Sequence, residues 1–190
     1  MDAVNRIAFK EWAVVCRALA DGAQSIILRK GGIDEGSEGF RVRHREFWLF
    51  PTQFHQRSEQ LVPEAGPLLE RVRAEGPPAG TIAIGQYVVV DDVCEINDES
   101  LLGRLAGFHI WSRETIVQRF QYRQPGLFLL LARVYRVPQP FLLSDTPYFA
   151  GCRSWIELPE ALPTTGAIPV LSDEQFAGVR ERVREALAGG

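Results

Sequence analysis

Apolar residues recur at helical spacing near both ends of the chain. Within 12–19 they occupy positions i, i+3, i+4 and i+7, which predicts a helix that stops at Gly22. Ser112 is suited to cap a second helix. The tail opens with the serine and glutamine of a capping box and predicts a third helix over 172–188.

Other segments have the apolar alternation or the β-branched composition that is typical of strands. Gly85 interrupts one of them and marks a predicted bulge. Glycine-rich turns separate the first two segments, so we expect a hairpin there, and the most apolar segment is predicted to be central. The five segments are 24–29, 40–50, 81–96, 127–137 and 154–158.

The order of these elements predicts the fold class. A helix is followed by strands, then by a helical insertion over about 58–78, more strands and a final helix, without regular alternation of strands and helices. Such an order is typical of α+β proteins. We therefore expect one domain over 1–190, with a curved, mostly antiparallel sheet or a small open β-barrel and flanking helices.

Composition excludes several classes of protein. Hydrophobic residues make up 46% of the 190 residues, enough for a sizeable core, and no apolar run is long enough to cross a membrane. The amino terminus carries no secretory pattern, so we expect a cytoplasmic protein. The net charge of -3 argues against a uniformly basic nucleic-acid binder, so any anion site must be local. Four arginines lie close together in the sequence: Arg41, Arg43, Arg45 and Arg57.

Catalytic patterns are sparse. The three histidines lack metal-ligand spacing, no phosphate-binding loop is present, and Cys152 has no evident base, so we expect no metal site and no cofactor. Asp91, Asp92 and Glu95 supply carboxylates of the kind that a metal-dependent hydrolase needs. The lysine that usually completes a restriction-nuclease site is absent after Glu95, so this interpretation is the alternative and not the preference.

Two resemblances go further than these patterns. The spacing Gly22-x-Gln24-x-x-x-x-Arg29 resembles the G-x-K-x-x-E-x-R signature of the ASCH domains, with Gln24 in place of the lysine and Ile27 in place of the glutamate. The segments "KEWAVVCRAL", "LRKGGI", "FWLFPTQFHQ" and "GCRSWIEL" resemble, over nearly the whole chain, the bacterial family called domain of unknown function 1802. ASCH and EVE domains are PUA-like, which implies a small curved barrel that binds RNA or modified bases. The second family brings no established activity.

A PUA-like fold implies a binding rim near the predicted hairpin. Cations would hold phosphate, aromatic rings would stack on an extruded base, and polar groups would read its edge. The residues that we expect there are Arg29, Lys30, Trp48, Phe50, Thr52, His55 and Gln56. Strand alternation leaves a second interpretation open, in which half of the aromatic residues are core and the arginines form a solvated face.

Three classes of function follow. We favour a non-catalytic module that binds RNA or DNA, single-stranded or carrying a modified base. The first alternative is the metal-dependent nucleotide or nucleic-acid hydrolase that uses Asp91, Asp92 and Glu95. The second is a docking module for a restriction-endonuclease-like partner, an association that the family resemblance implies, with "REFWLFPTQF" as its interface.

Overall fold

The fold is known from a computed structural model that describes residues 1–30, 42–54, 56–151 and 153–188. The strands are β1 (Val4–Trp12), β2 (Ile26–Arg29), β3 (Glu46–Thr52), β4 (Thr81–Ile96), β5 (Leu127–Ser144), β6 (Trp155–Pro163) and β7 (Ile168–Pro169). The helices are α1 (Ala13–Ala20), α2 (Gly66–Ala74), α3 (Ser100–Arg104), α4 (Arg113–Gln121) and α5 (Asp173–Ala188). Short 3₁₀ turns cover Ser58–Gln60, Pro63–Ala65 and Pro147–Phe149. Among the described residues, no helix is long and apolar enough to cross a membrane.

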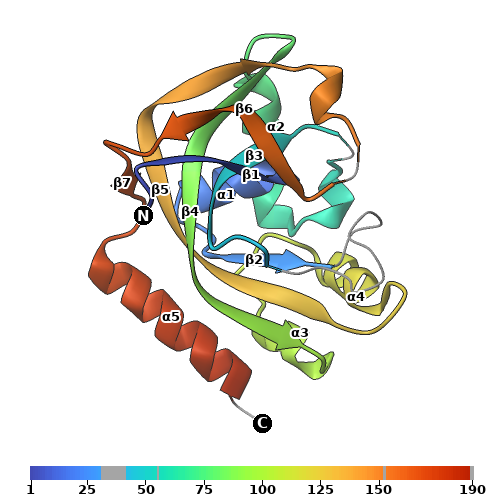
Figure 1. The fold of residues 1–190 in the computed structure, drawn as a ribbon. Coiled ribbons are helices and arrows are strands. Elements are labelled where there is room, and N and C mark those ends of the chain that lie inside the picture. Colours follow the sequence, from blue (N-terminus) through green and yellow to red (C-terminus); the bar gives the residue numbers. More distant parts are fainter. Residues whose placement is uncertain (31–41, 55, 152, 189–190) are drawn as a thin grey trace.

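One curved sheet organises the chain. Its strand order is β2-β5-β4-β3-β1-β6, with β7 paired to β5. All neighbouring strands are antiparallel except β1 and β3, which are parallel. Figure 1 shows β4 and β5 bending through the whole length of the molecule, with α5 along one side. The expected α+β class with a mostly antiparallel sheet and flanking helices is confirmed.

The locally encoded elements form as the sequence predicts. Helix α1 ends just before Gly22, which has a φ of 72°. Ser112 caps α4 by accepting the Thr115 N–H, and the capping box at the start of α5 is made in both directions between Ser172 and Gln175. The register of β4 against β5 shifts at Gly85, where the bulge is expected. Helix α2 supplies the helical part of the insertion.

The predicted hairpin between 24–29 and 40–50 is wrong. Strand β2 pairs with β5, whereas β3 pairs with β1 and β4. The glycine-rich turns are compatible with many paths, and the partner of each strand is set by contacts far along the chain. Strand β1, which the pattern analysis missed, lies between β3 and β6.

Strand β3 and residues 8–11 of β1 are buried on both faces, so two hydrophobic cores form. On β3, Phe47 and Leu49 belong to the larger core, which packs against α1, α4 and α5. Trp48 and Phe50 point the other way, into a smaller core that includes Tyr87. Alternating residues of one strand therefore supply both cores, and neither face of β3 is left for solvent.

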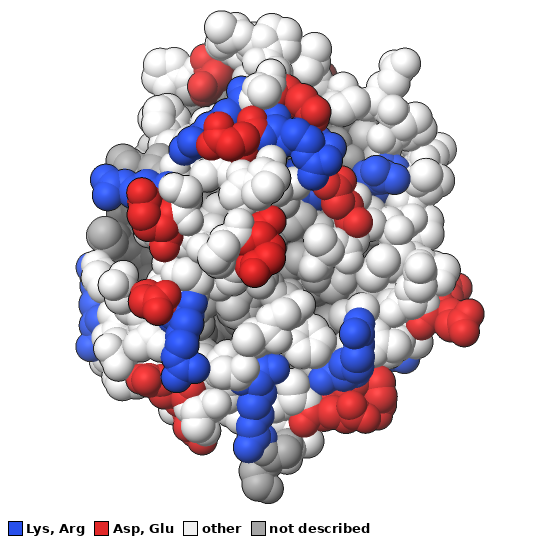
Figure 2. Space-filling view, turned by 180° about the vertical axis from the view of Figure 1, so that it is seen from behind, with Lys and Arg blue, Asp and Glu red and all other residues white. Residues whose placement is uncertain are grey.

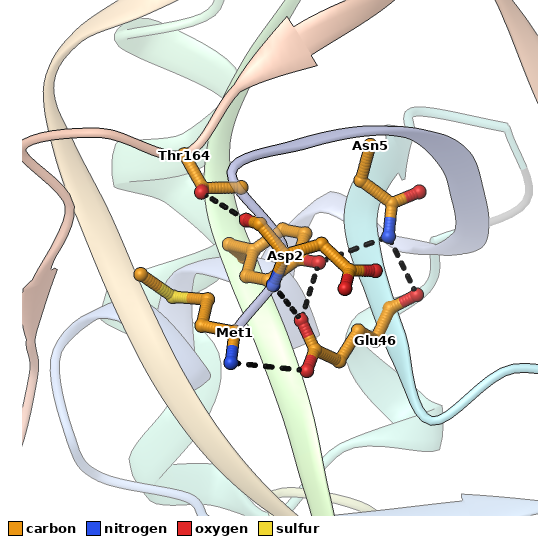
Figure 3. A network of polar contacts seen from close by, with 6 residues as sticks. Met1, Asp2, Asn5, Glu46 and Thr164 are labelled. Carbon is orange, nitrogen blue, oxygen red and sulfur yellow. Dashed lines mark hydrogen bonds and ion pairs between the residues drawn. The ribbon is translucent and has the colours of Figure 1, made fainter.

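A polar network fastens the start of β1 to its neighbours (Figure 3). The carboxylate of Glu46 accepts the Asp2 backbone N–H at 2.7 Å and the Tyr87 hydroxyl at 2.9 Å. Asn5 donates to the Tyr87 hydroxyl oxygen at 2.9 Å, and Thr164 donates to the Asp2 carbonyl. These bonds join β1, β3, β4 and the segment after β6, and they satisfy the Glu46 carboxylate inside the protein.

Gly22 gives the first prediction. A Cβ at this position would lie 2.9 Å from Leu171 Cδ2, in a left-handed conformation that alanine adopts at a cost of roughly 1–2 kcal/mol. Gly107 has a φ of 88° with no atom within 4 Å of such a Cβ, so Gly107→Ala carries the backbone cost alone. In urea denaturation we expect Gly22→Ala to lower the free energy of unfolding more than Gly107→Ala does. Equal decreases would show that the contact with Leu171 has no effect.

Candidate functional site

Trp48 and Phe50 lie inside the protein, contrary to the expected binding rim. Trp48 is 0% exposed and Phe50 is 3% exposed. The Trp48 indole N–H donates to the Asn5 carbonyl at 3.0 Å, and its ring packs edge-on against Tyr87. The prediction that these two rings offer a stacking surface is wrong, because both faces of β3 are covered. In the proposed interface "REFWLFPTQF", residues 47–50 are buried, whereas Arg45, Gln53 and Phe54 are exposed, Phe54 by 75%.

Lys30 is committed to the end of α4. Its ammonium donates to the carbonyls of Phe120 at 3.0 Å and Gly126 at 2.8 Å, and also to that of Gln124. Burial lowers its pKa from the ordinary value. A lysine near the carbonyl end of a helix interacts favourably with the helix dipole. Lys30 therefore stabilises the fold here and does not project toward a ligand.

Arg29 makes a bridge across the open side of the sheet. Its guanidinium lies 3.7 Å from the Glu11 carboxylate, donates to the Ser154 hydroxyl at 2.9 Å and lies 4.9 Å from the centre of the Phe9 ring. The Glu11 side chain is 1% exposed and that of Arg29 is 22% exposed. Since β2 begins the strand order and β1 is fifth in it, these contacts join strands that share no ladder.

Arg119 of α4 adds a second cation to this cluster. Its guanidinium lies 3.6 Å from the centre of the Trp111 ring and 5.7 Å from that of Trp12. Burial lowers the pKa of Arg119 to about 10, while the charge of Glu11 acts to raise it and that of Arg29 to lower it further. Two guanidinium groups therefore share the field of one buried carboxylate. Neither Glu11 nor Arg119 could be predicted from the sequence, because no local pattern links positions so far apart.

The remaining residues of the expected rim lie near this cluster or outside the described residues. Thr52 donates to the Glu11 carbonyl at 3.1 Å. Gln56 is buried, and its Oε1 accepts the Val14 N–H at 2.9 Å, which satisfies a backbone donor in the first turn of α1. His55 lies outside the described residues. Thr52 and Gln56 thus hold β1, β3 and α1 together.

A cleft opens beside the cluster, between the start of α1, the 56–60 segment and α4. Its volume is about 800 Å³, a size that accommodates a small ligand. Half-buried Trp12 lines it, and among the described lining residues the two arginines, Arg57 and Arg73, equal in number the two acids, Glu59 and Glu114, so their formal charges balance. Gln56, Gln60, Thr115 and Gln118 add polar groups.

Charge is also mixed beyond the cleft. On the face shown in Figure 2, basic and acidic side chains of the described residues are interspersed, and no large patch of one sign covers it. Around α1 and α2 the arginines have acidic partners, as in the pair Arg17 and Glu75 at 3.0 Å. The described residues of this face therefore offer no broad basic surface for binding nucleic acid.

The alternative carboxylates face the last helix. Asp91 lies 3.6 Å from Arg180, and Asp92 lies 4.0 Å from Arg184, both of α5. Glu95 is exposed. Within the described residues, no group of three His, Cys, Asp or Glu side chains is placed to hold a metal ion. The ion pairs give Asp91 and Asp92 a role in docking α5, and the geometry offers no support for the hydrolase.

The buried cluster gives a second prediction. We expect Glu11→Gln to lower the free energy of unfolding by about 3–5 kcal/mol, because Arg29 and Arg119 lose their buried counter-charge. Glu75→Gln is the matched control, since it removes a carboxylate from a surface pair with Arg17 and is expected to cost less than about 1 kcal/mol. Urea denaturation measures both, and similar decreases would contradict a central role for Glu11.

His109 makes stability depend on pH. Its Nδ1 accepts the Trp111 N–H at 3.1 Å, and its buried Nε2 has no hydrogen-bond partner among the described residues. Burial lowers the pKa of His109 from 6.5 to about 4. Between these values the unfolded chain binds a proton that the folded chain does not. The free energy of unfolding is therefore highest above about pH 6.5 and decreases toward pH 4. The protonation of His109 accounts for a decrease of up to about 3 kcal/mol.

Denaturation at about pH 7.5 and pH 5 tests the His109 prediction. His109→Asn is the matched variant, because its side-chain oxygen remains available to accept the Trp111 N–H. We expect the variant to lose less stability than the wild type on acidification. The same decrease in both proteins would assign the pH dependence to other groups.

Comparisons with known proteins gave one family and a set of solved structures. Crystal structures of an ASCH protein from Zymomonas mobilis are similar in fold: one is 10% identical, covers 92% of this chain and 93% of that chain, and has a TM-score of 0.45. A single-substitution variant of it is 9% identical, covers 95% of this chain and 98% of that chain, and has a TM-score of 0.49. The search of curated proteins gave no match. The family model described as Domain of unknown function (DUF1802) matches residues 8–182, which confirms the resemblance noted in the sequence. The chain belongs to the domain of unknown function 1802 family.

Proposed function

We propose that this protein is a non-catalytic nucleic-acid-binding module that takes an unpaired base, plain or modified, into the cleft beside Trp12. The observation that carries this proposal is the placement of a half-buried indole on the wall of a cleft of about 800 Å³. Base stacking on an aromatic side chain is worth about 1–3 kcal/mol and tolerates any base. Trp12 thereby takes the part that the sequence analysis gave to Trp48 and Phe50.

The indole of Trp12 is held in place before any ligand arrives. Its ring meets that of Trp111 edge-on at a centroid distance of 4.8 Å, and Trp111 is 1% exposed and carries the Arg119 guanidinium on its face. A rigid aromatic platform loses little conformational entropy on binding. Glu11 and Arg119 are therefore positioning residues for Trp12 in this proposal.

The other groups in the cleft suit the edge of a base better than a row of phosphates. Arg57 and Arg73 are balanced by Glu59 and Glu114, so the cleft has no formal excess of positive charge. Gln118 is exposed at its rim, and an amide side chain can both donate and accept. Recognition of unpaired bases by stacking and by hydrogen bonds to their edges is typical of single-stranded RNA binding.

The resemblance to ASCH domains in the G-x-K-x-x-E-x-R region supports the same class of ligand, because it implies a PUA-like barrel that binds RNA or modified bases. The residues at two positions of this motif, Gln24 and Arg29, make contacts within the protein. The Gln24 amide donates to the Ile26 carbonyl and accepts the Ile110 N–H, and Arg29 contacts Glu11. A restriction-endonuclease-like partner, also implied by the family, would supply the chemistry that this module lacks.

Fluorescence anisotropy with labelled single-stranded RNA, plain DNA and modified-base DNA tests the proposal. We expect saturable binding by the wild type, and at least tenfold weaker binding by Trp12→Ala because a stacking surface is removed. Arg57→Glu gives a second test that leaves the core intact, because Arg57 is exposed. Arg136→Glu is its matched control, since Arg136 is exposed on β5 and does not line the cleft.

Two results would overturn this function. One is that the wild type binds none of the oligonucleotides. The other is that Trp12→Ala and Arg57→Glu both bind as tightly as the wild type. Preference for one ligand in the panel would identify whether RNA, DNA or a modified base is read.

A further inference from the structure

A second depression, separate from the cleft, lies along the first half of β1. Its volume is about 540 Å³. Residues 4–7 of β1, residues 43–46 before and at the start of β3, and Ala161 of β6 line it. Three arginines from two separate segments meet there: Arg6, Arg43 and Arg45. We call this depression the β1 groove.

The arginines of the β1 groove differ in how far their side chains are engaged within the protein. Arg43 and Arg45 are exposed, and no hydrogen bond or ion pair joins the side chain of either one to another of the described residues. Arg6 donates to the Pro159 carbonyl at 3.0 Å and lies 3.8 Å from the Glu157 carboxylate. That pair is between exposed groups, which in water attract each other only weakly. Arg6 also donates to the Leu158 carbonyl at 3.3 Å, so the guanidinium groups that are available to an anion are those of Arg43 and Arg45.

The nearest acidic group in the lining is already occupied. Glu46 accepts the Asp2 N–H and the Tyr87 hydroxyl, and the amino-terminal ammonium lies 3.3 Å from it (Figure 3). Burial acts to raise the pKa of Glu46, but these bonds outweigh it and the pKa is lowered. The carboxylate thus stays charged but directs its oxygens toward β1 and β4. Asp2 is the other acid among the described residues of the lining, so these residues together carry an excess of positive charge.

His44 completes the lining with a ring that can donate a hydrogen bond. Its centroid lies 5.2 Å from that of Trp155, in an edge-on contact. Burial, and then the charge of Arg43, lower the pKa of His44, so its ring is neutral at pH 7. A neutral imidazole adds a donor to the guanidinium groups without adding a charge.

We propose that the β1 groove is a phosphate-binding site for the backbone of the strand whose base enters the Trp12 cleft. This inference rests on the proposed function, and it answers a deficit in that site: the cleft is charge-balanced, while Arg29 and Lys30 are engaged inside the protein. Arginine forks match the geometry of phosphate oxygens. Ile7 in the groove and Trp12 in the cleft are separated by roughly 17 Å at the rise of a strand, with residues 8–11 buried between them. A single strand that reaches both sites over the surface therefore needs a few nucleotides.

The salt dependence of binding is the direct test. For a single strand, the slope of log K against log salt changes by about 0.7 for each phosphate that the protein ceases to neutralise. We expect Arg43→Gln/Arg45→Gln to bind oligonucleotide at least tenfold more weakly than wild type, with a slope that is shallower by about 1.4. The matched control is Arg136→Gln/Arg182→Gln, which removes the same charge from exposed sites outside both linings and is expected to keep the slope.

A second measurement separates this inference from the proposed function. Inorganic tripolyphosphate is titrated into ¹⁵N-labelled protein. We expect the backbone amide signals of residues 43–46 to shift in the wild type and to stay unchanged in Arg43→Gln/Arg45→Gln. If no oligonucleotide binds but these signals shift, the nucleic-acid function fails and the groove is a site for free phosphates. If oligonucleotide binds and its salt slope is unchanged in the double variant, the groove proposal is overturned while the function stands. If neither probe binds, both are overturned.

Discussion

The buried carboxylate of Glu11 is the point on which the architecture of this protein depends. The sheet is an open path, and its ladders leave β2 and β1 unpaired with each other. The Arg29 side chain spans this gap and contacts Glu11 and Ser154, while the Glu11 carbonyl accepts a hydrogen bond from the Thr52 hydroxyl. A carboxylate without partners would be costly at this depth, so the cations are required by the burial itself. Side chains close the curved sheet where backbone pairing does not.

The same cluster connects the fold to the cleft. Arg119 lies within the field of Glu11 and stacks on Trp111, which in turn supports Trp12 at the cleft wall. A chain of contacts therefore runs from the closure of the sheet to the surface where a base would stack. Disturbing Glu11 is expected to be felt both in stability and in binding, whereas the exposed arginines of the cleft and of the β1 groove can change without disturbing the core.

The sequence predicted the elements whose signals are local and failed where contacts between distant segments decide. Capping at Ser112 and Ser172, the helix stop at Gly22 and the bulge at Gly85 each depend on a few neighbouring residues. The pairing of β2 with β5 does not depend on neighbouring residues, and the predicted hairpin was therefore wrong. Trp48 and Phe50 were expected at the surface because a PUA-like fold implies a binding rim there, but a second core covers that face of β3. The pairing of Glu11 with Arg29 left no sequence signal.

The indole N–H signals in a ¹⁵N–¹H spectrum give the most direct test that the stacking surface is Trp12. The chain has four tryptophans, and Trp12, Trp48, Trp111 and Trp155 each give one indole signal. On titration with a single-stranded oligonucleotide, the account predicts the largest shift for the Trp12 signal and a stationary Trp48 signal, because Trp48 is 0% exposed. A shift of Trp48 while Trp12 stays fixed would contradict the account and return the binding surface to β3.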